Sequence, residues 1–374
     1  MNSIYKDLTQ KYATTEELFA FLRSDEGGRL IIRDTDDAAH AMIYYDKKTS
    51  NMEAPTVQWF RSVIWNKSTN HPVCVSPPRG RKFSAAVDAG LTDFVVEDFV
   101  DGVMINMFHD GQGWRLATRT QYGATGHFYG SQPFATLFHE AAMAQGLSLT
   151  TVFDTSLCYS WVLQHPEERV VVPCSYGIPH IFNVGCWRIH ADASIEAMRP
   201  LPLQAPLVHD IKTLEDVKDR VAILGKRHGY KWQGFVIKMA DGNRYKIRSR
   251  EYDAVRELRG NQANRPFTWL ERWSSGSLTE YLKIYPEEQH QAQAVVDTFK
   301  ALTQETYNWY QRVYKAREMP LGQAPRKFRK LLWDAHTTGK GSYFANLRDF
   351  MNGLDTARKL WLVNFEARFA PATA

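Results

Sequence analysis

The chain has 374 residues, of which 44% are hydrophobic and 23% charged, with a formal net charge of +5 and a pI near 8.8. This composition is typical of a globular protein and excludes a low-complexity chain, and no apolar run reaches the 18 residues that a membrane span needs. The first 22 residues are polar and lack the apolar core of a secretory signal, so we expect an intracellular protein. The mild basic charge is compatible with nucleic-acid binding but does not require it.

Short predicted strands dominate the first part of the chain after a helical start. Residues 3 to 22 have a helical pattern, with Thr14 or Thr15 as the N-cap. Alternating and β-branched residues then predict strands at Val57 to Val63, Pro72 to Ser76, Phe94 to Val96, Val103 to Phe108 and Trp114 to Thr120. Asp110-Gly111 predicts a hairpin turn between the last two.

Helices and strands alternate irregularly up to about residue 255. Helices are predicted at Pro133 to Gly146 and at Leu214 to His228. Strands are predicted in "LTTVFDT", "SWVLQ", "RVVVP", "IFNVGCWRIH" and the hairpin pair "GFVIKM" and "RYKIRS". Antiparallel hairpins outnumber any βαβ units, so the predicted fold class is α+β.

The last third of the chain has a helical pattern only. Val295, Phe299, Leu302, Trp309 and Val313 recur at helical spacing. We therefore place a domain boundary near residue 260, with residues 1–260 as the first domain, its first 55 residues as a subregion, and residues 261–374 as an all-helical domain. The helical domain holds 16 Lys and Arg against 11 Asp and Glu, an excess equal to the charge of the whole chain.

The four cysteines do not have the spacing of a metal site. Cys74, Cys158, Cys174 and Cys186 lie far apart and none has a histidine nearby at ligand spacing. We interpret them as small buried residues and not as a zinc site or a disulfide framework.

Four segments, taken in order, carry a family resemblance. They are "FRSVIW", "DFVDGVMINMF", "WVLQHPEERVVVP" and "QGFVIKMADGNRYKIRS", and they lie within residues 55 to 255. In this order they resemble the phage-type ATP-dependent RNA ligases of the covalent nucleotidyltransferase superfamily. Those ligases carry an Arg-Gly strand, a Lys-x-Asp-Gly motif, a Glu-containing strand followed by Pro-x-Asn-Arg, a Glu-Gly strand and a Lys-x-Lys strand around ATP.

The resemblance implies a fold, a cofactor and a reaction. The fold would be an antiparallel-sheet, ATP-grasp-like nucleotidyltransferase domain followed by a helical domain. In such ligases a lysine takes AMP from ATP, passes it to an RNA 5′-phosphate, and the RNA 3′-OH then displaces it. ATP, Mg²⁺ and RNA would be the cofactors and partner, and a viral or phage-like origin would fit.

The matching residues are mainly those that would hold a phosphorylated ligand. Asp101, Lys246 and Arg248 are the candidate catalytic residues that survive. The nucleotide-binding candidates are Arg61, Gly102, Arg119, Lys238, Lys246 and Arg248. Arg169 matches the Arg of Pro-x-Asn-Arg, with Glu168 in place of the Asn.

The departures fall on the residues that perform covalent transfer. Phe99 stands at the lysine nucleophile, Val162 at the glutamate of the third motif and Gln233 at the glutamate of the fourth. A phenyl ring cannot form a phosphoramidate, and neither Val nor Gln provides the charge that binds Mg²⁺. Conventional lysine adenylation is not expected, and the metal ligands remain unknown.

Several residues have both a functional and a structural interpretation. Lys82 and Lys238 are the nearby amines that could replace the nucleophile. His165 is a possible base or nucleophile, although a histidine beside a proline at a strand end is more often structural. Glu97 and Asp98, with Asp101, could hold a metal, or they could form the charged edge of a hairpin.

Two functions of different class follow. The first is a divergent RNA-ligase-like nucleotidyltransferase that acts on RNA ends. The second is a catalytically degenerate ligase fold that binds RNA or nucleotide without covalent chemistry. In either case the basic segment of the helical domain, with Arg326, Lys327, Arg329 and Lys330, is a candidate RNA-binding patch or a solvated helix face.

Overall fold

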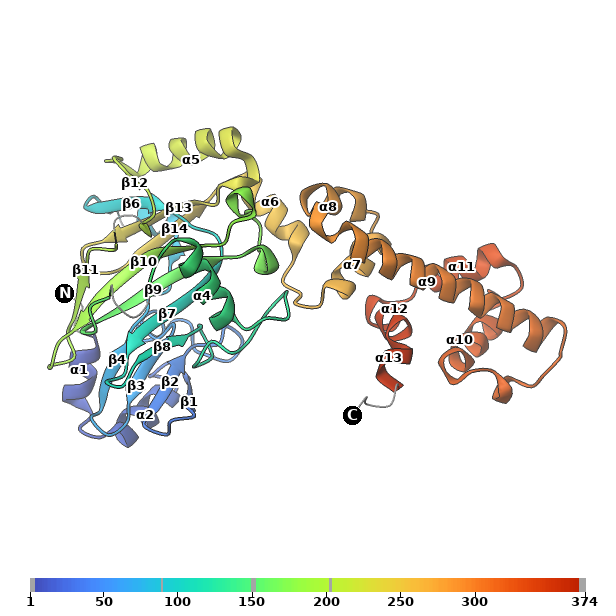
Figure 1. The fold of residues 1–374 in the computed structure, drawn as a ribbon, viewed down its shortest axis with the longest axis horizontal. Helices are drawn as coiled ribbons and strands as arrows, with labels where there is room; N and C mark the ends of the chain where they lie inside the picture. The colour runs from blue at the N-terminus through green and yellow to red at the C-terminus, as the bar shows by residue number, and fades with distance from the viewer. Residues whose placement is uncertain (1–3, 89, 149–152, 202–203, 370–374) are drawn as a thin grey trace. The chain divides into compact units, whose positions relative to one another are not determined.

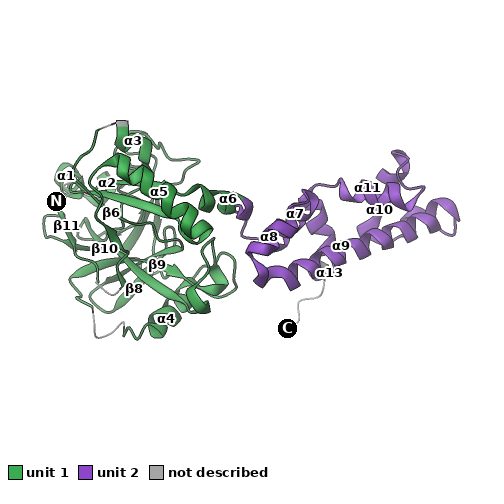
Figure 2. Cartoon of the chain, turned by 90° about the horizontal axis from the view of Figure 1, so that it is seen from above, with its two compact units in different colours: residues 1–257 green, residues 258–374 purple. Residues whose placement is uncertain are grey.

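The computed structural model describes residues 4–88, 90–148, 153–201 and 204–369. The chain divides into two compact units, residues 1–257 and 258–374 (Figure 2). Figure 1 shows antiparallel sheets in the first unit and helices alone in the second, which confirms the predicted α+β class with a helical C-terminal region. No helix among the described residues is both long and apolar enough to cross a membrane.

The first unit contains three sheets. A four-stranded sheet has the order β1 (Ile31–Asp34), β2 (His40–Tyr44), β3 (Val63–Asn66), β4 (His71–Cys74). A five-stranded sheet, sheet A, has the order β11 (Ile195–Met198), β10 (His180–Ile189), β9 (Leu157–Gln164), β7 (Val103–His109), β8 (Trp114–Ala117). A second five-stranded sheet, sheet C, has the order β12 (Val208–His209), β6 (Phe94–Asp98), β13 (Gly234–Met239), β14 (Arg244–Arg248), β5 (Arg81–Lys82). Every pairing between these strands is antiparallel except that of β14 with β5.

Helices cover the outer apolar face of each five-stranded sheet. The helices of this unit are α1 (Ile4–Lys11), α2 (Thr15–Arg23), α3 (Phe83–Asp88), α4 (Phe134–Ala144) and α5 (Leu214–His228), and α6 (Arg250–Arg259) crosses the boundary between units. The apolar stripe of α4, including Leu137 and Phe138, packs on Ile105 and Trp161 of sheet A. Val217 and Val221 of α5 pack on Phe235 of sheet C.

The faces of sheets A and C that α4 and α5 do not cover are available to form a binding site. Side chains alternate along a strand, so the residues of β13 and β14 that do not join the core under α5 lie on the other face. On β14 these residues are Arg244, Lys246 and Arg248. On sheet A the corresponding face carries Met104 and Val162, which are paired across β7 and β9.

Three predicted elements differ from the structure. The helical pattern predicted over residues 3 to 22 is divided between two helices, and the predicted N-cap Thr14 begins the second, α2, with a capping box that includes Glu17. The strand predicted at Val57 to Val63 is a series of turns up to the start of β3. "RVVVP" is a loop whose N–H groups bind a buried carboxylate and not a neighbouring strand. The strand predicted in "LTTVFDT" lies mostly outside the described residues.

The second unit consists of helices around one core. These are α7 (Arg265–Ser274), α8 (Leu278–Ile284), α9 (Gln289–Tyr310), α10 (Arg326–Thr337), α11 (Phe344–Asn352), α12 (Thr356–Val363) and α13 (Phe365–Phe369). Phe299, Phe328 and Leu347, each buried, bring α9, α10 and α11 into that core.

One buried carboxylate connects the first helices of this unit. Glu288 accepts from Arg259 Nη1 at 2.6 Å, from Trp269 Nε1 at 2.7 Å and from Tyr281 OH at 2.7 Å. Arg259 and its neighbours lower the pKa of Glu288 despite burial, which acts to raise it. The cluster is a charge network closed within the protein.

We predict that Glu288→Gln lowers the free energy of unfolding by about 3 kcal/mol, because it leaves the buried Arg259 guanidinium without its counter-charge. Chemical denaturation of the whole chain measures this. The matched control is Glu271→Gln, which removes a carboxylate paired with Arg272 at the surface and should cost less than about 1 kcal/mol. Equal losses for the two variants would contradict the prediction.

Candidate nucleotide site

The loop between β6 and β7 joins the two five-stranded sheets. It contains Phe99, Val100, Asp101 and Gly102, because β6 ends at Asp98 in sheet C and β7 begins at Val103 in sheet A. The Phe99 N–H donates to the Gly234 carbonyl at 2.8 Å, so the loop is fastened to the start of β13. Phe99 and Gln233, which lie 134 positions apart in sequence, are therefore neighbours in space.

Gly102 is required by the backbone. Its φ is +143°, and a Cβ placed there would lie 2.3 Å from the Leu163 carbonyl oxygen and 2.9 Å from Val162 Cγ1. A side chain at this position would push β9 away from the loop. The close approach also places Val162 directly beside the loop.

Asp101 uses its carboxylate to hold three segments together. Its Oδ2 accepts from the N–H groups of Val171 and Val172 at 2.9 and 2.8 Å, and its Oδ1 accepts from Tyr252 OH at 2.7 Å. Burial raises the pKa of Tyr252 far above its usual range, and the neighbouring Asp101 carboxylate adds to the shift. These contacts give Asp101 an organising role within the protein.

A pocket lies between the inner faces of the two sheets. Its walls come from β6, β7, β9, β10, β13, β14 and the loops beside them. The lining residues are Arg61, Pro77, Glu97, Asp98, Phe99, Val100, Gly102, Met104, Val162, Val184, Pro206, Val236 and Arg244. Its empty volume is about 540 Å³, part of it open to solvent. We call it the apolar slot, because its lining is mainly aliphatic.

The two carboxylates of the slot are paired with protein groups. Glu97 Oε2 lies 2.6 Å from Lys238 Nζ, and Lys238 also donates to the Val184 carbonyl at 3.2 Å. Burial lowers the pKa of Lys238, and Glu97 opposes that shift. Asp98 Oδ1 lies 2.9 Å from both His209 Nε2 and Trp232 Nε1.

The residues present do not fit a divalent metal. Within the described ranges no group of three or more His, Cys, Asp or Glu side chains is arranged to hold an ion. Glu97, Asp98 and Asp101 each bind different protein partners and do not converge. Val162 offers no ligand at all, and Gln233 offers only a neutral amide oxygen.

Cations gather beside the slot. Arg244, Lys246 and Arg248 lie on one face of β14, where period-two alternation places them together. Burial, together with the positive charges of Arg248, Arg61, Lys47 and Arg79, lowers the pKa of Lys246 to about 8. We call the set Lys47, Arg61, Arg79, Arg119, Arg244, Lys246 and Arg248 the cationic cluster.

The cluster is poorly neutralised. Among the described residues no carboxylate lies within ion-pair distance of Arg61, Arg119 or Lys246, and Arg248 is 3.9 Å from Asp253. The Nε of Arg244 and that of Arg248 are buried without a hydrogen-bond partner. Burial and the neighbouring Arg61 lower the pKa of Arg244 to about 10. Such crowding of like charges favours the binding of an anion.

An arginine lies over the ring of Phe99. The Arg248 guanidinium carbon lies 5.1 Å from the centre of the Phe99 ring, a cation–π distance. Gln233 is buried with its side-chain carbonyl oxygen unpaired. The structure thus brings together Phe99, Val162 and Gln233, the three sites of departure, around one loop.

The alternative residues have other surroundings. His165 accepts from the Glu167 N–H and its Nε2 lies 3.1 Å from Glu140, which is a capping role at the end of β9. Glu168 accepts from the N–H groups of residues 128–130, and Arg169 Nε donates to the Val171 carbonyl. Lys82 is exposed on β5, directly beside Lys246 in the strand register.

The basic segment of the second unit lies on α10. Lys327 contacts Glu305 and Glu366 at 3.5 and 3.0 Å, and Lys330 lies 3.1 Å from Asp334. Arg329 Nε donates to the Ala324 carbonyl, and Arg326 is exposed at the start of the helix. The ion pairs reduce the positive charge that this segment offers to an anion.

Sequence reasoning missed three cations of the cluster. Arg244 was detectable, because it continues the alternation of Lys246 and Arg248 along the same strand. Lys47 follows β2 and Arg79 follows β4, two strands of the four-stranded sheet. The sequence around each of them has no motif that would predict a binding residue. Only the packing of separate segments brings them into the electrostatic range of Lys246.

Comparisons with known protein families and with curated protein sequences find no match. Among solved structures, an archaeal ATP-dependent RNA ligase (form 1) is 12% identical, with 78% of each chain covered and a TM-score of 0.45. The RNA ligase of Naegleria gruberi solved with PPi is 14% identical, covering 49% of this chain and 58% of that one, with a TM-score of 0.36. A mutant of the Naegleria ligase was solved with ATP and Mn, and it is 15% identical over 47% of this chain with a TM-score of 0.34. The present chain thus spans a little over half the length of the Naegleria ligase, and the resemblance is distant.

We predict that Lys246→Met raises the melting temperature at pH 7. The pKa of Lys246 in the folded chain, about 8, lies below its ordinary value of 10.5, so the unfolded chain binds the proton more tightly. The lysine therefore opposes folding below pH 8, and that penalty fades as the pH rises from 8 to 10.5. Thermal unfolding at pH 7 and pH 10 measures the difference, which should shrink at the higher pH.

Lys218→Met provides the matched control, because Lys218 is exposed on α5. It should shift the melting temperature little at either pH. A melting temperature for Lys246→Met at or below that of the unmodified chain at pH 7 would contradict the electrostatic account of the cluster.

Proposed function

We propose that the first unit binds a nucleotide, or the phosphorylated end of an RNA, without forming a covalent adenylate. The observation that carries this is the apolar slot beside the cationic cluster, in which Arg61, Arg119 and Lys246 have no carboxylate within ion-pair distance among the described residues. An apolar slot suits a flat base or ribose, and adjacent cations suit its phosphates. Phosphate oxygens would give the buried guanidinium N–H groups of Arg244 and Arg248 the acceptors that they lack.

Within this proposal the residues have distinct roles. Arg248 and Lys246 hold phosphate oxygens, with Arg61 and Arg119 extending the contact. Lys238 neutralises Glu97 inside the slot, and Gly102 keeps the loop close to β9. Asp101 does not touch the ligand and instead fixes the loop, as its three hydrogen bonds favour. ATP is a suitable ligand for these groups, and no step through a metal ion is derived.

The surroundings of Phe99 and of the nearby lysines support the non-covalent form of this proposal. The ring of Phe99 has no electron pair for the α-phosphate, and the Arg248 guanidinium lies over it. Of the candidate substitute amines, Lys238 is bound to Glu97 and Val184. Lys82 is exposed at the edge of sheet C, where its charge can assist phosphate binding.

We predict that the whole chain binds 5′-phosphorylated RNA more tightly than the same RNA with a 5′-hydroxyl. Arg248→Gln should weaken binding of the phosphorylated RNA by about 10-fold or more, as for loss of a charge-assisted contact of about 1.5–3 kcal/mol. Fluorescence anisotropy with a 3′-labelled oligonucleotide measures both affinities. Arg220→Gln is the control, because Arg220 is exposed on α5.

Two results would argue against the proposal. One is equal affinity for the 5′-phosphate and 5′-hydroxyl RNAs. The other is the same loss for Arg220→Gln as for Arg248→Gln, which would indicate diffuse attraction by the net positive charge.

A second candidate function is the sealing of an RNA end that is already adenylated. In that reaction the RNA 3′-OH attacks the activated 5′-phosphate and AMP leaves, so no protein nucleophile is needed. The cationic cluster favours it, because positioning and charge stabilisation are the main contributions a protein makes to phosphoryl transfer. Under this candidate the chain is a divergent RNA-ligase-like enzyme, and Asp101, Lys246 and Arg248 are its essential residues.

We predict that restoring a lysine restores covalent labelling only if the loop is a former nucleophile site. Phe99→Lys combined with Gln233→Glu, incubated with α-labelled ATP and Mg²⁺ or Mn²⁺, should retain label on a denaturing gel, whereas the unmodified chain should not. Phe99→Met with Gln233→Glu is the matched control without an amine. Label on the unmodified chain would overturn the non-covalent proposal.

The same proteins separate the two candidate functions. Joining of a pre-adenylated RNA by the unmodified chain would establish the sealing reaction. Binding of phosphorylated RNA with no joining would leave the binding function.

The second unit supplies a further RNA contact in this proposal. Arg326, Arg329 and Lys330 are exposed on α10, and Trp333 beside them is 55% exposed. An exposed indole next to cations suits a base and its phosphate. The ion pairs of Lys327 and Lys330 limit the strength of this contact.

A further inference from the structure

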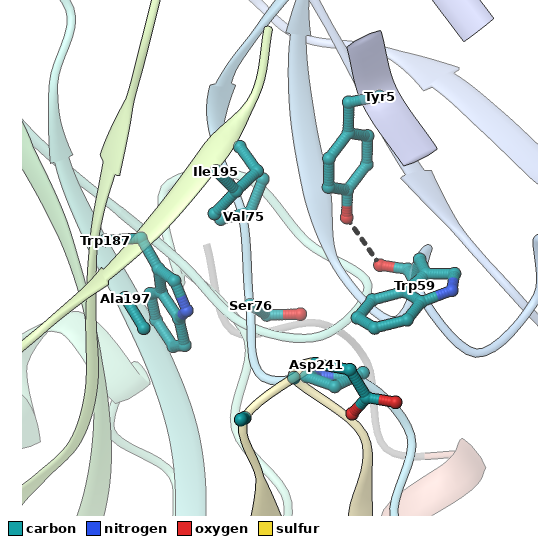
Figure 3. A pocket seen from close by; sticks show the side chains of 11 residues that line it. Tyr5, Trp59, Val75, Ser76, Trp187, Ile195, Ala197 and Asp241 are labelled. Atoms are coloured by element: carbon teal, nitrogen blue, oxygen red, sulfur yellow. Dashed lines mark hydrogen bonds between the residues drawn. The ribbon is translucent and has the colours of Figure 1, made fainter. Parts of the chain in front are cut away.

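A second pocket lies in the first unit, outside the apolar slot. The residues that line it include Tyr5, Trp59, Ser76, Trp187, Ala197 and Asp241, which are labelled in Figure 3. Its empty volume is about 480 Å³, part of it open to solvent. We call it the aromatic pocket. We propose that it binds an unpaired nucleobase of a nucleic acid strand whose phosphate lies in the cationic cluster.

Two indole rings give the aromatic pocket its shape. Trp59 and Trp187 are each partly exposed and both line it, and in Figure 3 they lie on opposite sides of Ser76. The backbone carbonyl of Trp59 is fixed by Tyr5 OH at 2.8 Å, so one wall is held in place. Partly exposed indole faces at a concave site are suited to stacking with a flat ring.

A buried hydroxyl indicates a polar ligand. Ser76 is 4% exposed, and its Oγ is buried without a hydrogen-bond partner. A hydroxyl can both donate and accept, and leaving it unpaired in a buried site is unfavourable. The ring nitrogens and exocyclic groups of a nucleobase provide the partner that Oγ lacks.

Asp241 selects against a phosphate at this pocket. Its carboxylate accepts from the N–H and side-chain amide of Asn243 at 2.8 and 2.6 Å, which fixes it in the β13–β14 turn. A carboxylate repels a phosphate but accepts from the amino group of a base. The aromatic pocket therefore suits the base of a nucleotide, whereas the cationic cluster suits its phosphate.

Neighbouring residues of the chain line the two sites. Ser76 and Pro78 line the aromatic pocket, whereas Pro77 between them lines the apolar slot. The turn that contains Asp241 leads into β14, and Arg244 at its start lines the slot. A strand with its terminal nucleotide in the slot would thus pass one segment of chain to reach the second pocket. The inference that one nucleic acid strand occupies both sites rests on the proposed phosphate-binding function.

The test uses the whole chain and short 5′-phosphorylated RNAs in which one base at a time is removed. In the unmodified chain, an abasic residue at one position near the 5′ end should lower affinity by about 5- to 100-fold, as for the loss of one stacked base. Ala197→Phe should remove this sensitivity. Ala197 is exposed on β11 opposite Trp187, so a phenyl ring there fills the pocket without disturbing the core.

The controls distinguish a blocked pocket from an altered fold. Ala144→Phe adds the same ring at an exposed position of α4, which covers the opposite face of sheet A, and it should keep the abasic sensitivity. Ser76→Ala removes the hydroxyl and keeps the walls, and it should reduce the sensitivity. Melting temperatures within a few degrees of the unmodified chain would show that each variant folds.

Each outcome separates this inference from the proposed function. Phosphorylated RNA that binds equally well with an abasic residue at every position would overturn the inference and leave phosphate binding intact. If no phosphorylated RNA binds, adenosine without a phosphate becomes the probe, measured by ligand-observed NMR. Adenosine binding that Ala197→Phe abolishes would support the aromatic pocket alone, and no adenosine binding would overturn it.

Discussion

The buried carboxylate of Asp101 is the interaction on which the arrangement of the first unit depends. It joins the loop between β6 and β7 to the N–H groups of Val171 and Val172 and to the hydroxyl of Tyr252. That loop is one of the covalent links between the two five-stranded sheets, and the hydrogen bonds of Asp101 fix its position. The carboxylate accepts all three of these hydrogen bonds, so its contacts are within the protein and its contribution is to the architecture of the unit.

The side chains near this loop combine unneutralised cations with uncharged neighbours. Arg248 lies over the ring of Phe99, and Gln233 keeps an unpaired carbonyl beside it. Desolvated cations without carboxylate partners are unfavourable in the free protein, as the lowered pKa values of Lys246 and Arg244 indicate. A polyanion removes that disadvantage, which is why non-covalent binding of a phosphorylated ligand is the function that the geometry supports best.

In the inference drawn above, the two pockets of the first unit bind different parts of one nucleic acid strand. The cationic cluster attracts phosphate, whereas the aromatic pocket presents two indoles, a buried hydroxyl and a carboxylate. Because Pro77 lines one site and its two neighbours line the other, a small shift of this segment would affect both. Binding would then depend on a phosphate and a base together, which is more selective than either contact alone.

The sequence by itself determined the local elements and part of the site. Alternation predicted β13 and β14, glycine and apolar spacing predicted α4, and the order of the motifs placed Phe99 and Gln233 at one site, where the structure makes them neighbours. The periodicity of apolar residues depends only on the segment itself, so it was sufficient to predict these strands and this helix. They failed at "RVVVP", where β-branched residues serve a buried carboxylate 70 positions away. Only the tertiary structure gathered Lys47 and Arg79 around Lys246 and formed the aromatic pocket, because those contacts arise from packing between distant segments that no local pattern encodes.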